Sequence, residues 1–389
     1  MSKWEWKKLK DVCVFIGDGD WIESKDQSSK GIRLIQTGNI GNGIYLDKKE
    51  RSHYISKTTF CRLHCTEIFP GDCLISRLPE PTGRACVIPD IAEKMITAVD
   101  CTIVRFCEFF APNFFIYYAQ SEKYFSDVKS ESTGATRKRI SRKNLENIKI
   151  PVPPLSEQKR IVKFLDEEFS KIDTLKTNAE TNLKNAKELF ETTLEKELNP
   201  PSRHSERSEE SSADLPSGWE WKKLGEVCEI ICGQDYKNVE CESGAYPVYG
   251  SGGVIGYARE FRCPANCTIV GRKGSINNPM YVEEPFWNID TAFGLSAKEC
   301  MESKYLFYFC KCFDFTTLDK SSGRPSLARK DLLEIQIPLP PLSVQKEIVA
   351  RLDKLSENVK RLEANYKQII ANCDELKKSI LKKTFEEKT

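Results

Sequence analysis

Basic and polar side chains gather in glycine-containing segments that could bind a phosphate backbone. The strongest segment, residues 271–278, reads Gly-Arg-Lys-Gly-Ser-Ile-Asn-Asn. Glycine lets the main chain approach a phosphate closely, and arginine and lysine can reach phosphates or the edge of a guanine. Arg272, Lys273, Ser275 and Asn277 are therefore candidate contacts to a nucleic acid.

Similar segments recur elsewhere in the chain. Ser76-Arg77, continuing to Gly83-Arg84, stands at the place in the first half that corresponds to this segment in the second. The further candidates share a basic, hydroxyl or amide side chain in or beside such a loop: Thr37, Asn39, Arg77, Arg84, Arg137, Lys138, Arg139, Arg142, Lys143, Ser251, Arg324, Arg329 and Lys330. Taken singly, each fits a solvated surface charge as well. Clusters at matching places of two copies favour a binding role.

The elements that position these residues follow from an internal repeat. The sequence Trp-Glu-Trp-Lys-Lys-Leu occurs at residues 4–9 and again at 219–224. Ile-Pro-Val-Pro-Pro-Leu-Ser at 150–156 returns as Ile-Pro-Leu-Pro-Pro-Leu-Ser at 337–343. The segments between these copies differ, so a scaffold is kept while the part that it presents is replaced. This pattern is typical of an adapter protein that must recognise two different targets.

Each variable segment has the pattern of short strands, glycine-rich turns and a few helices. The apolar runs at 73–75 and 268–270 predict central strands. The aromatic runs at 109–118 and 305–313 predict helices that pack on a sheet. We therefore expect an α+β fold with two mixed, β-rich domains.

A long helix is expected after each proline-rich segment, with Ser156 and Ser343 as the N-caps. The second helix carries an unbroken heptad pattern from Ile348 to Ile380, and the first carries the same pattern with Lys176 as its polar interruption. Helices of this length need a partner. A pseudo-two-fold repeat would set them antiparallel, as a coiled coil that separates the domains. At about 1.5 Å per residue each would be roughly 65 Å long, enough to hold two readers on half-sites of one DNA duplex.

Composition limits the alternatives. The net charge of the 389 residues is +2, so any affinity for DNA must come from local basic patches. The first ten residues have no apolar core and no stretch is long enough to span a membrane, so we expect neither a signal peptide nor a membrane contact. The 16 cysteines lack the paired spacing of zinc sites, which favours reduced thiols in the cytoplasm and no metal.

Catalysis by this chain itself is not expected. Asn199-Pro200-Pro201-Ser202 lacks the aromatic residue that an adenine methyltransferase uses to stack a flipped base, and it falls in a polar segment. No phosphate-binding Gly-x-x-x-x-Gly-Lys-Ser/Thr is present. The three histidines offer little material for acid–base chemistry.

The chain resembles the specificity subunits of type I restriction–modification enzymes over nearly its whole length. The resemblance is carried by the Trp-Lys-Lys-Leu and Thr-Gly-Asn-Ile motifs at 6–9 and 37–40, by Gly-Asp at 71–72, by Tyr-Pro-Val-Tyr-Gly-Ser at 246–251, and by two Pro-Pro-Leu-Ser-x-Gln-Lys segments, each followed by a heptad helix. It implies target-recognition domains at 1–154 and 219–341 and long helices at 155–198 and 342–389. The polar, proline-containing segment at 199–218 predicts a flexible linker and departs from the family pattern.

The resemblance also implies partners and a function. Such a subunit is non-catalytic and reads a bipartite site on double-stranded DNA. It would bind methyltransferase subunits, of which we expect two, and motor-nuclease restriction subunits. The complex would be an adenine-specific DNA methyltransferase and a type I endonuclease. S-adenosylmethionine, ATP and Mg²⁺ would belong to the partners, and no cofactor to this chain.

Two alternatives remain open. One is a structural coiled-coil protein whose β-rich ends bind other proteins. The other is an adapter that serves a methyltransferase without any nuclease. A two-part DNA site with strongly salt-dependent affinity would favour the specificity subunit over the first alternative.

Overall fold

The computed structural model describes residues 4–134, 138–198, 215–242 and 246–386. The chain divides into two compact units: unit 1 holds residues 1–179 and 368–389, and unit 2 holds residues 180–367. Each expected long helix therefore contributes residues to both units. Residues 199–214 of the expected linker lie outside the described residues, and so does Arg137.

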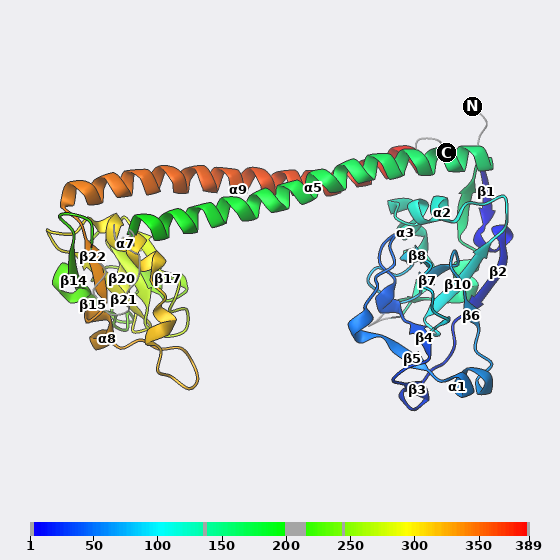
Figure 1. Ribbon diagram of the computed structural model, residues 1–389, viewed down its shortest axis with the longest axis horizontal. Helices are drawn as coiled ribbons and strands as arrows, with labels where there is room; N and C mark the ends of the chain where they lie inside the picture. The colour runs from blue at the N-terminus through cyan, green and yellow to red at the C-terminus, as the bar shows by residue number, and fades with distance from the viewer. Residues whose placement is uncertain (1–3, 135–137, 199–214, 243–245, 387–389) are drawn as a thin grey trace, which may run out of the picture. The chain divides into compact units, whose positions relative to one another are not determined.

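Unit 1 is built on an antiparallel four-stranded sheet in the order β2-β10-β7-β8 and a mixed five-stranded sheet in the order β3-β5-β4-β9-β6 (Figure 1). Every residue of β7 is buried, as the apolar run at 73–75 predicts for a central strand. Two short ladders join β1 to β13 and β11 to β12. The strands are β1 Glu5–Lys8, β2 Cys13–Asp18, β3 Gln27–Ser28, β4 Ile32–Ile35, β5 His53–Ile55, β6 Glu67–Ile68, β7 Cys73–Ser76, β8 Ala85–Val87, β9 Met95–Thr97, β10 Cys101–Phe106, β11 Ser132–Thr133, β12 Arg139–Ile140 and β13 Lys149–Val152.

The short helices of unit 1 begin at residues that satisfy free backbone amides. Ser56, Ser121 and Ser141 accept hydrogen bonds from the backbone at the starts of α1, α3 and α4, and α2 begins with Pro112, whose missing N–H would be unpaired there. The helices are α1 Lys57–Arg62, α2 Pro112–Tyr118, α3 Glu122–Ser130 and α4 Arg142–Glu146, with 3₁₀ turns η1 Leu9–Val12, η2 Ser24–Asp26, η3 Thr37–Asn39 and η4 Lys49–Arg51. The expected aromatic helix at 109–118 thus starts three residues later, at the proline.

Unit 2 repeats this plan with fewer strands. Its antiparallel four-stranded sheet has the order β15-β21-β18-β19, a three-stranded sheet has the order β17-β16-β20, and β14 pairs with β22. The strands are β14 Glu220–Lys223, β15 Cys228–Cys232, β16 Tyr246–Gly250, β17 Gly253–Ala258, β18 Cys267–Gly271, β19 Met280–Val282, β20 Trp287–Asn288, β21 Ala292–Ala297 and β22 Gln336–Leu339. The helices are α6 Leu224–Val227, α7 Ser303–Cys312 and α8 Arg329–Leu333, with the 3₁₀ turn η5 Phe315–Leu318.

Strand registers confirm the repeat. In unit 1 Glu5 pairs with Val152, and in unit 2 Glu220 pairs with Leu339. The two halves of each repeated motif, far apart in sequence, therefore lie side by side as a two-stranded ladder. This explains why both ends of the repeat are kept while the intervening segment varies.

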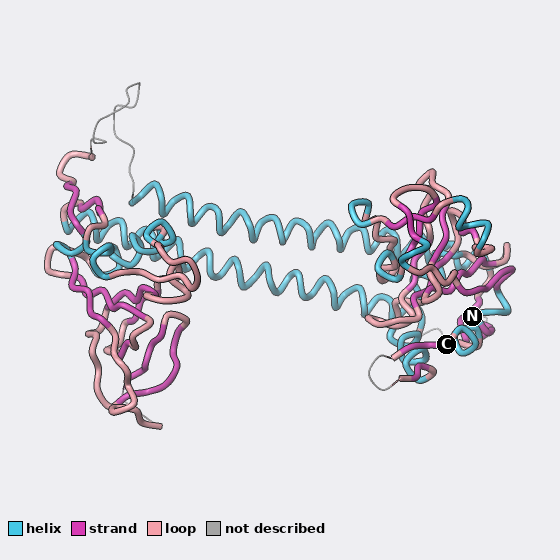
Figure 2. Tube along the Cα trace, turned by 90° about the horizontal axis from the view of Figure 1, so that it is seen from below, coloured by secondary structure: helices cyan, strands magenta, loops and turns pink. Residues whose placement is uncertain are grey.

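The two long helices are α5, Leu155–Leu198, and α9, Leu342–Phe385, each of 44 residues and drawn as long uninterrupted coils in Figure 2. Neither contains glycine or proline, as unbroken helices require. The expected N-caps are wrong by two residues. The amides of Gln158 and Gln345 donate to the carbonyls of Pro154 and Pro341, so Ser156 and Ser343 lie inside the first turn.

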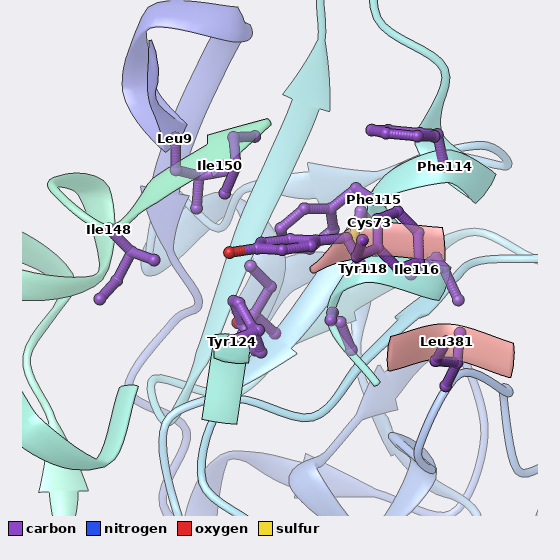
Figure 3. Packing of buried hydrophobic residues seen from close by; sticks show 14 of the residues in the cluster. Leu9, Cys73, Phe114, Phe115, Ile116, Tyr118, Tyr124, Ile148, Ile150 and Leu381 are labelled. Carbon is purple, nitrogen blue, oxygen red and sulfur yellow. The ribbon is translucent and has the colours of Figure 1, made fainter. Parts of the chain in front are cut away.

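In unit 1 the end of α9 completes the core. Phe385 is 1% exposed and contacts Trp4, Phe114 and Tyr118 with ring centroids 6.4, 5.6 and 5.5 Å apart. Leu381 joins the same cluster, and Figure 3 shows it on its helix segment beside the buried aromatic side chains of α2.

The two helices run antiparallel where they meet within unit 1. Lys176 Nζ lies 2.7 Å from Asp374 Oδ1, and Lys377 Nζ lies 2.5 Å from Asp173 Oδ1, so numbers rise on α5 as they fall on α9. Lys176, the polar interruption of the heptad, therefore makes an ion pair between the helices.

Unit 2 has the reciprocal arrangement. Leu194 and Leu198, at the end of α5, belong to its hydrophobic core together with Ile348 and Leu352 of α9. Glu197 accepts two hydrogen bonds from Arg351, at 3.0 and 2.6 Å. Each unit thus contains the start of one long helix and the end of the other, which is the antiparallel pairing expected from the repeat.

The heptad positions of the long helices differ in burial. Leu352, Val359 and Cys373 are buried, whereas Leu362 and Leu376 are 39% and 49% exposed. Part of the apolar stripe therefore faces outward. Within the described segments, no helix has the length and apolar character needed to cross a membrane.

Candidate nucleic-acid interface

In unit 1 the ends of several strands are joined by backbone hydrogen bonds at one edge of the sheets. The amide of Arg77, which follows β7, donates to the carbonyl of Asp100 at 2.9 Å, and that of Ala98 donates to Ile35 at 3.0 Å. The amide of Ile140 donates to the carbonyl of Arg77 at 3.3 Å. The loops after β4 and β7, the turn before β10 and the segment before α4 are thereby brought together.

The same edge exists in unit 2. The amide of Arg272 donates to Thr291 at 2.8 Å, that of Ile289 donates to Tyr249 at 3.0 Å, and that of Leu327 donates to Arg272 at 2.8 Å. Arg272 therefore matches Arg77, Arg329 matches Arg142, and Lys330 matches Lys143. The expected correspondence between the two basic clusters therefore holds in position for Arg142 and Lys143, whereas Arg137 lies outside the described residues.

A glycine directly after β2 in unit 1, and directly after β15 in unit 2, makes this edge possible. A Cβ on Gly19 would lie 2.2 Å from the carbonyl oxygen of Ala98, and one on Gly233 would lie 1.9 Å from that of Ile289. No side chain fits at either crossing. We attribute both glycines to this close approach of two backbones.

Arginines at the edge of unit 1 are paired with carboxylates. Asp18 Oδ1 lies 3.2 Å from Arg77 Nη2, and Asp18 Oδ2 accepts from Arg142 Nε at 3.0 Å. The hydrogen bond to Asp18 raises the pKa of Arg142, whereas burial lowers the pKa of Arg77, which is 5% exposed. Arg77 is therefore an inner group, and Arg142 is the accessible one.

Arg139 is the second accessible arginine of this edge. Its Nη2 lies 3.0 Å from Asp100 Oδ1, and its side chain is 47% exposed. Lys138 and Lys143 are also exposed. The backbone carbonyl of Lys138 accepts from Thr82 Oγ1 at 3.5 Å, which ties this segment to the neighbouring loop.

Arg84 stabilises the loops of this edge through hydrogen bonds to backbone carbonyls. Its guanidinium donates to the carbonyls of Ile40, Thr37, Leu78 and Pro81 at 2.7 to 3.1 Å and is 9% exposed. It fixes the turn η3 and the loop after β7. We therefore assign it to shaping the edge rather than to contacting a ligand.

Thr37 and Asn39 lie in η3. Both are half-buried, and Asn39 holds the turn closed: its Oδ1 accepts from the amide of Gln36 at 3.0 Å and its Nδ2 donates to the carbonyl of Leu46 at 3.0 Å. Ser251 occupies the place of Thr37 in unit 2, because it stands two residues after Tyr249 as Thr37 stands two after Ile35. Ser251 is 9% exposed.

The basic loop of unit 2 is more open. Arg272 is half-buried, with its guanidinium 5.7 Å from the Phe293 ring centroid, and Lys273 Nζ lies 3.6 Å from Asp290 Oδ2. Gly274 has φ +84°, and a Cβ there would lie 2.9 Å from Arg324 Nη2. The glycine thus makes room for this exposed arginine.

The remaining candidates of unit 2 lie around that loop. Ser275 and Asn277 are exposed, and Asn277 Oδ1 accepts from the amide of Phe315 at 2.9 Å. Arg329 and Lys330 are exposed at the start of α8. The amide of Gly274 donates to the carbonyl of Pro325 at 2.9 Å, which holds the loop against the segment that carries Arg324.

Sequence reasoning missed the acidic members of this edge. Asp18 and Asp100 partner the arginines of unit 1, but a search for basic clusters passes over them. The Gly-Asp-Gly-Asp run at 17–20 was the available signal, since aspartates between glycines mark a tight turn. Among the described residues, no group of three or more histidine, cysteine or acidic side chains is arranged to hold a metal.

Comparisons with known proteins match both units. A family model described as the type I restriction modification DNA specificity domain matches residues 1–185 and 216–371. The chain is 27% identical over 289 residues to the type I restriction enzyme MjaVIII specificity subunit of Methanocaldococcus jannaschii, across 64% of this chain and 65% of that protein. It is 24% identical to the putative MjaX specificity subunit of the same organism, across 92% of this chain and 89% of that one.

A solved structure supports the fold. A chain from a structure described as the basis of complex assembly and conformational transition of the type I R-M system aligns with a TM-score of 0.80 at 21% identity, covering 100% of this chain and 99% of that chain. The agreement extends to both units. At this identity the likeness concerns the fold alone.

Proposed function

Because this chain belongs to the family of type I restriction–modification DNA specificity proteins, we propose that it reads a bipartite DNA site, one half-site with each unit. The observation that carries this proposal is the equivalent edge in both units. In each, an arginine follows the central strand, and a short helix beginning with Arg-Lys lies beside it. Two weak readers in one chain bind one duplex far more tightly than either alone, since the second contact is made at high effective concentration.

The difference between the two loops supports different half-sites. Arg272 and Lys273 lie next to the turn at Gly274, where Lys273 pairs with Asp290, whereas Arg139 and Arg142 pair with Asp100 and Asp18. A good contact to a base edge favours the correct base over a wrong one by about 1–3 kcal/mol, so a few contacts in each unit are enough to make binding sequence-specific. Contacts to phosphates would fix the position of the protein along the DNA duplex.

We further propose that the chain is a non-catalytic subunit that docks methyltransferase subunits, two in number because the chain is a repeat of two units, together with motor-nuclease restriction subunits. Large apolar side chains exposed on the long helices support docking: Phe164, Leu175, Leu189, Leu342, Leu362, Ile369 and Leu376. Exposed apolar groups of this kind mark surfaces that a partner covers. The adenine methylation, the cofactor S-adenosylmethionine, and ATP with Mg²⁺ would belong to these partners.

The test is reconstitution of the chain with a methyltransferase subunit of a type I system, followed by methylation sequencing of DNA treated with the complex. The proposal expects adenine methylation at one two-part sequence with a fixed unread spacer. Methylation at no defined site would sink it. Methylation at a continuous site would contradict the bipartite reading alone.

Docking is tested separately by co-purification. Leu175→Glu and Leu376→Glu place a charge on the exposed apolar stripe and should abolish recovery of the methyltransferase subunit. Lys163→Glu, at a side chain that is 80% exposed on α5, is the matched control and should leave recovery unchanged. Full recovery with both leucine variants would exclude this stripe as the docking surface.

A further inference from the structure

Asp18 stands between two arginines of the edge in unit 1. One carboxylate oxygen lies 3.2 Å from the buried Arg77 and the other lies 3.0 Å from Arg142, whose side chain is 41% exposed. Arg142 also contacts Glu146 of its own helix. The carboxylate of Asp18 thus lies between the guanidinium groups of Arg77 and Arg142, and it accepts a hydrogen bond from Arg142 Nε.

Asp100 holds Arg139 in the same way. The two groups lie 3.0 Å apart, and their side chains are 32% and 47% exposed. Among the described residues of this edge, the exposed arginines Arg139 and Arg142 thus each pair with a carboxylate, an anion that a guanidinium binds with the same geometry as a phosphate.

Unit 2 has neither carboxylate. Asp18 lies opposite Thr102 and Cys232 lies opposite Phe293, the matching residues of β10 and β21, so Cys232 stands at the place of Asp18. Thr291 stands at the place of Asp100, because its carbonyl accepts from Arg272 as that of Asp100 accepts from Arg77.

The charges of unit 2 are arranged differently as a result. Asp290 pairs with Lys273 at 3.6 Å. Arg324, Arg329 and Lys330 are exposed. The basic side chains of unit 2 therefore meet less opposing charge at this edge than those of unit 1.

We propose that Asp18 and Asp100 are specificity-determining residues of unit 1, acting as internal substitutes for DNA phosphates. This inference rests on the proposed DNA-reading function. Random-sequence DNA gains little binding free energy at this edge, because a phosphate only replaces a carboxylate that already neutralises the arginine. Binding becomes favourable where base contacts are added. In unit 2, phosphates bind basic side chains directly, so this unit supplies more of the sequence-independent affinity for DNA.

Salt dependence measures this difference. Each phosphate that a protein neutralises contributes about 0.9 to the negative slope of log K against log salt concentration on duplex DNA. A variant that frees one arginine for a phosphate therefore steepens the slope by about 0.9 and tightens binding on the order of tenfold at 0.1 M salt.

The experiment measures binding of the full chain to a random-sequence duplex over a salt series. Asp100→Asn should steepen the slope by about 0.9. Asp18→Asn should steepen it by less, since Arg142 keeps Glu146. The matched variants Cys232→Asp and Thr291→Asp add carboxylates at the equivalent, partly or fully exposed places of unit 2 and should make the slope shallower.

The outcomes separate this inference from the proposed function. A wild-type chain with no affinity for either the random duplex or its methylated target sequence contradicts the function itself. Wild-type binding with unchanged slopes in Asp18→Asn and Asp100→Asn overturns the inference alone. Asp100 is the safer variant for folding because its partner is half exposed, so unaltered binding by folded Asp100→Asn decides against the inference even if Asp18→Asn unfolds.

Discussion

Gln158 and Gln345 make the same three hydrogen bonds in the two units. Gln158 accepts from the amide of Ala111 at 2.7 Å and donates to the carbonyls of Pro153 and Phe109 at 2.8 and 3.2 Å. Gln345 accepts from the amide of Glu302 at 2.7 Å and donates to Pro340 and Cys300 at 2.9 and 3.0 Å. Both are fully buried. This is the role of the glutamine in the repeated Pro-Pro-Leu-Ser-x-Gln-Lys motif: it fastens each long helix to the loop before α2 or α7.

Gln158→Ala should destabilise unit 1 by about 3 kcal/mol, because it leaves buried backbone groups unpaired. The measurement is urea unfolding followed by tryptophan fluorescence. Lys159→Ala, at the exposed next position of the helix, should change the midpoint little. Equal midpoints for both variants would contradict the fastening role.

Phe385→Ala should lower the free energy of unfolding of unit 1 by about 3–5 kcal/mol, since it empties a large buried aromatic position. Thermal unfolding of the full chain gives the readout. Phe164→Ala removes an aromatic ring that is 47% exposed and serves as the control, with an expected loss under about 1 kcal/mol. A Phe385→Ala protein as stable as the control would mean that the end of α9 is not part of this core.

Asp20→Asn should stabilise the protein, and more so at higher pH. Burial raises the pKa of Asp20 from 3.8 to about 6. The folded protein therefore keeps a proton on Asp20 at pH values where the unfolded chain has lost it. The stability that this proton contributes is fully present below pH 4 and is lost as pH rises through 6. Because Asp20 is only partly buried, we expect a gain of only about 1 kcal/mol at pH 8 and almost none at pH 4. Unfolding midpoints at the two pH values check this, and a pH-independent difference would be against it.

Arg272→Ala combined with Lys273→Ala should relax or weaken one half-site and spare the other, because both side chains belong to unit 2. The expected loss is about 1–3 kcal/mol for each base contact removed. Methylation sequencing reports the two half-sites separately. Equal loss at both half-sites would refute the assignment of one half-site to each unit.

Seven residues inserted into both long helices should lengthen the unread spacer of the DNA site. A seven-residue insertion keeps the heptad phase and adds about 10 Å to each helix. The spacer is counted from methylated sites of the reconstituted enzyme. A spacer of unchanged length in an active variant would show that these helices do not set it.

The repeat allowed most of the fold to be predicted from the sequence. Both long helices start where the proline-rich segments end, at Leu155 and Leu342, and the runs at 73–75 and 268–270 form inner strands. The N-caps at Ser156 and Ser343 were wrong because the carbonyls of the preceding prolines accept the first helical hydrogen bonds. Serine two residues later then has no capping task.

The site was harder to predict than the fold. The basic clusters at 137–143 and 324–330 could be named as candidates because charge is visible in sequence. The burial of Arg77 and Arg84 was not, since it depends on carbonyls and carboxylates contributed by loops far away in the chain, such as Thr37, Ile40 and Asp18. DNA binding by the individual residues stays a prediction.

Phe385 also bears on how the protein is made. Synthesis at about 5–20 residues per second releases Trp4, Phe114 and Tyr118 from the ribosome on the order of ten seconds or more before the phenylalanine that covers them. The domain that emerges first is thus among the last to be finished. A polypeptide that stops short of its final helix turns would leave this aromatic surface uncovered, and exposed apolar surface of this kind favours aggregation.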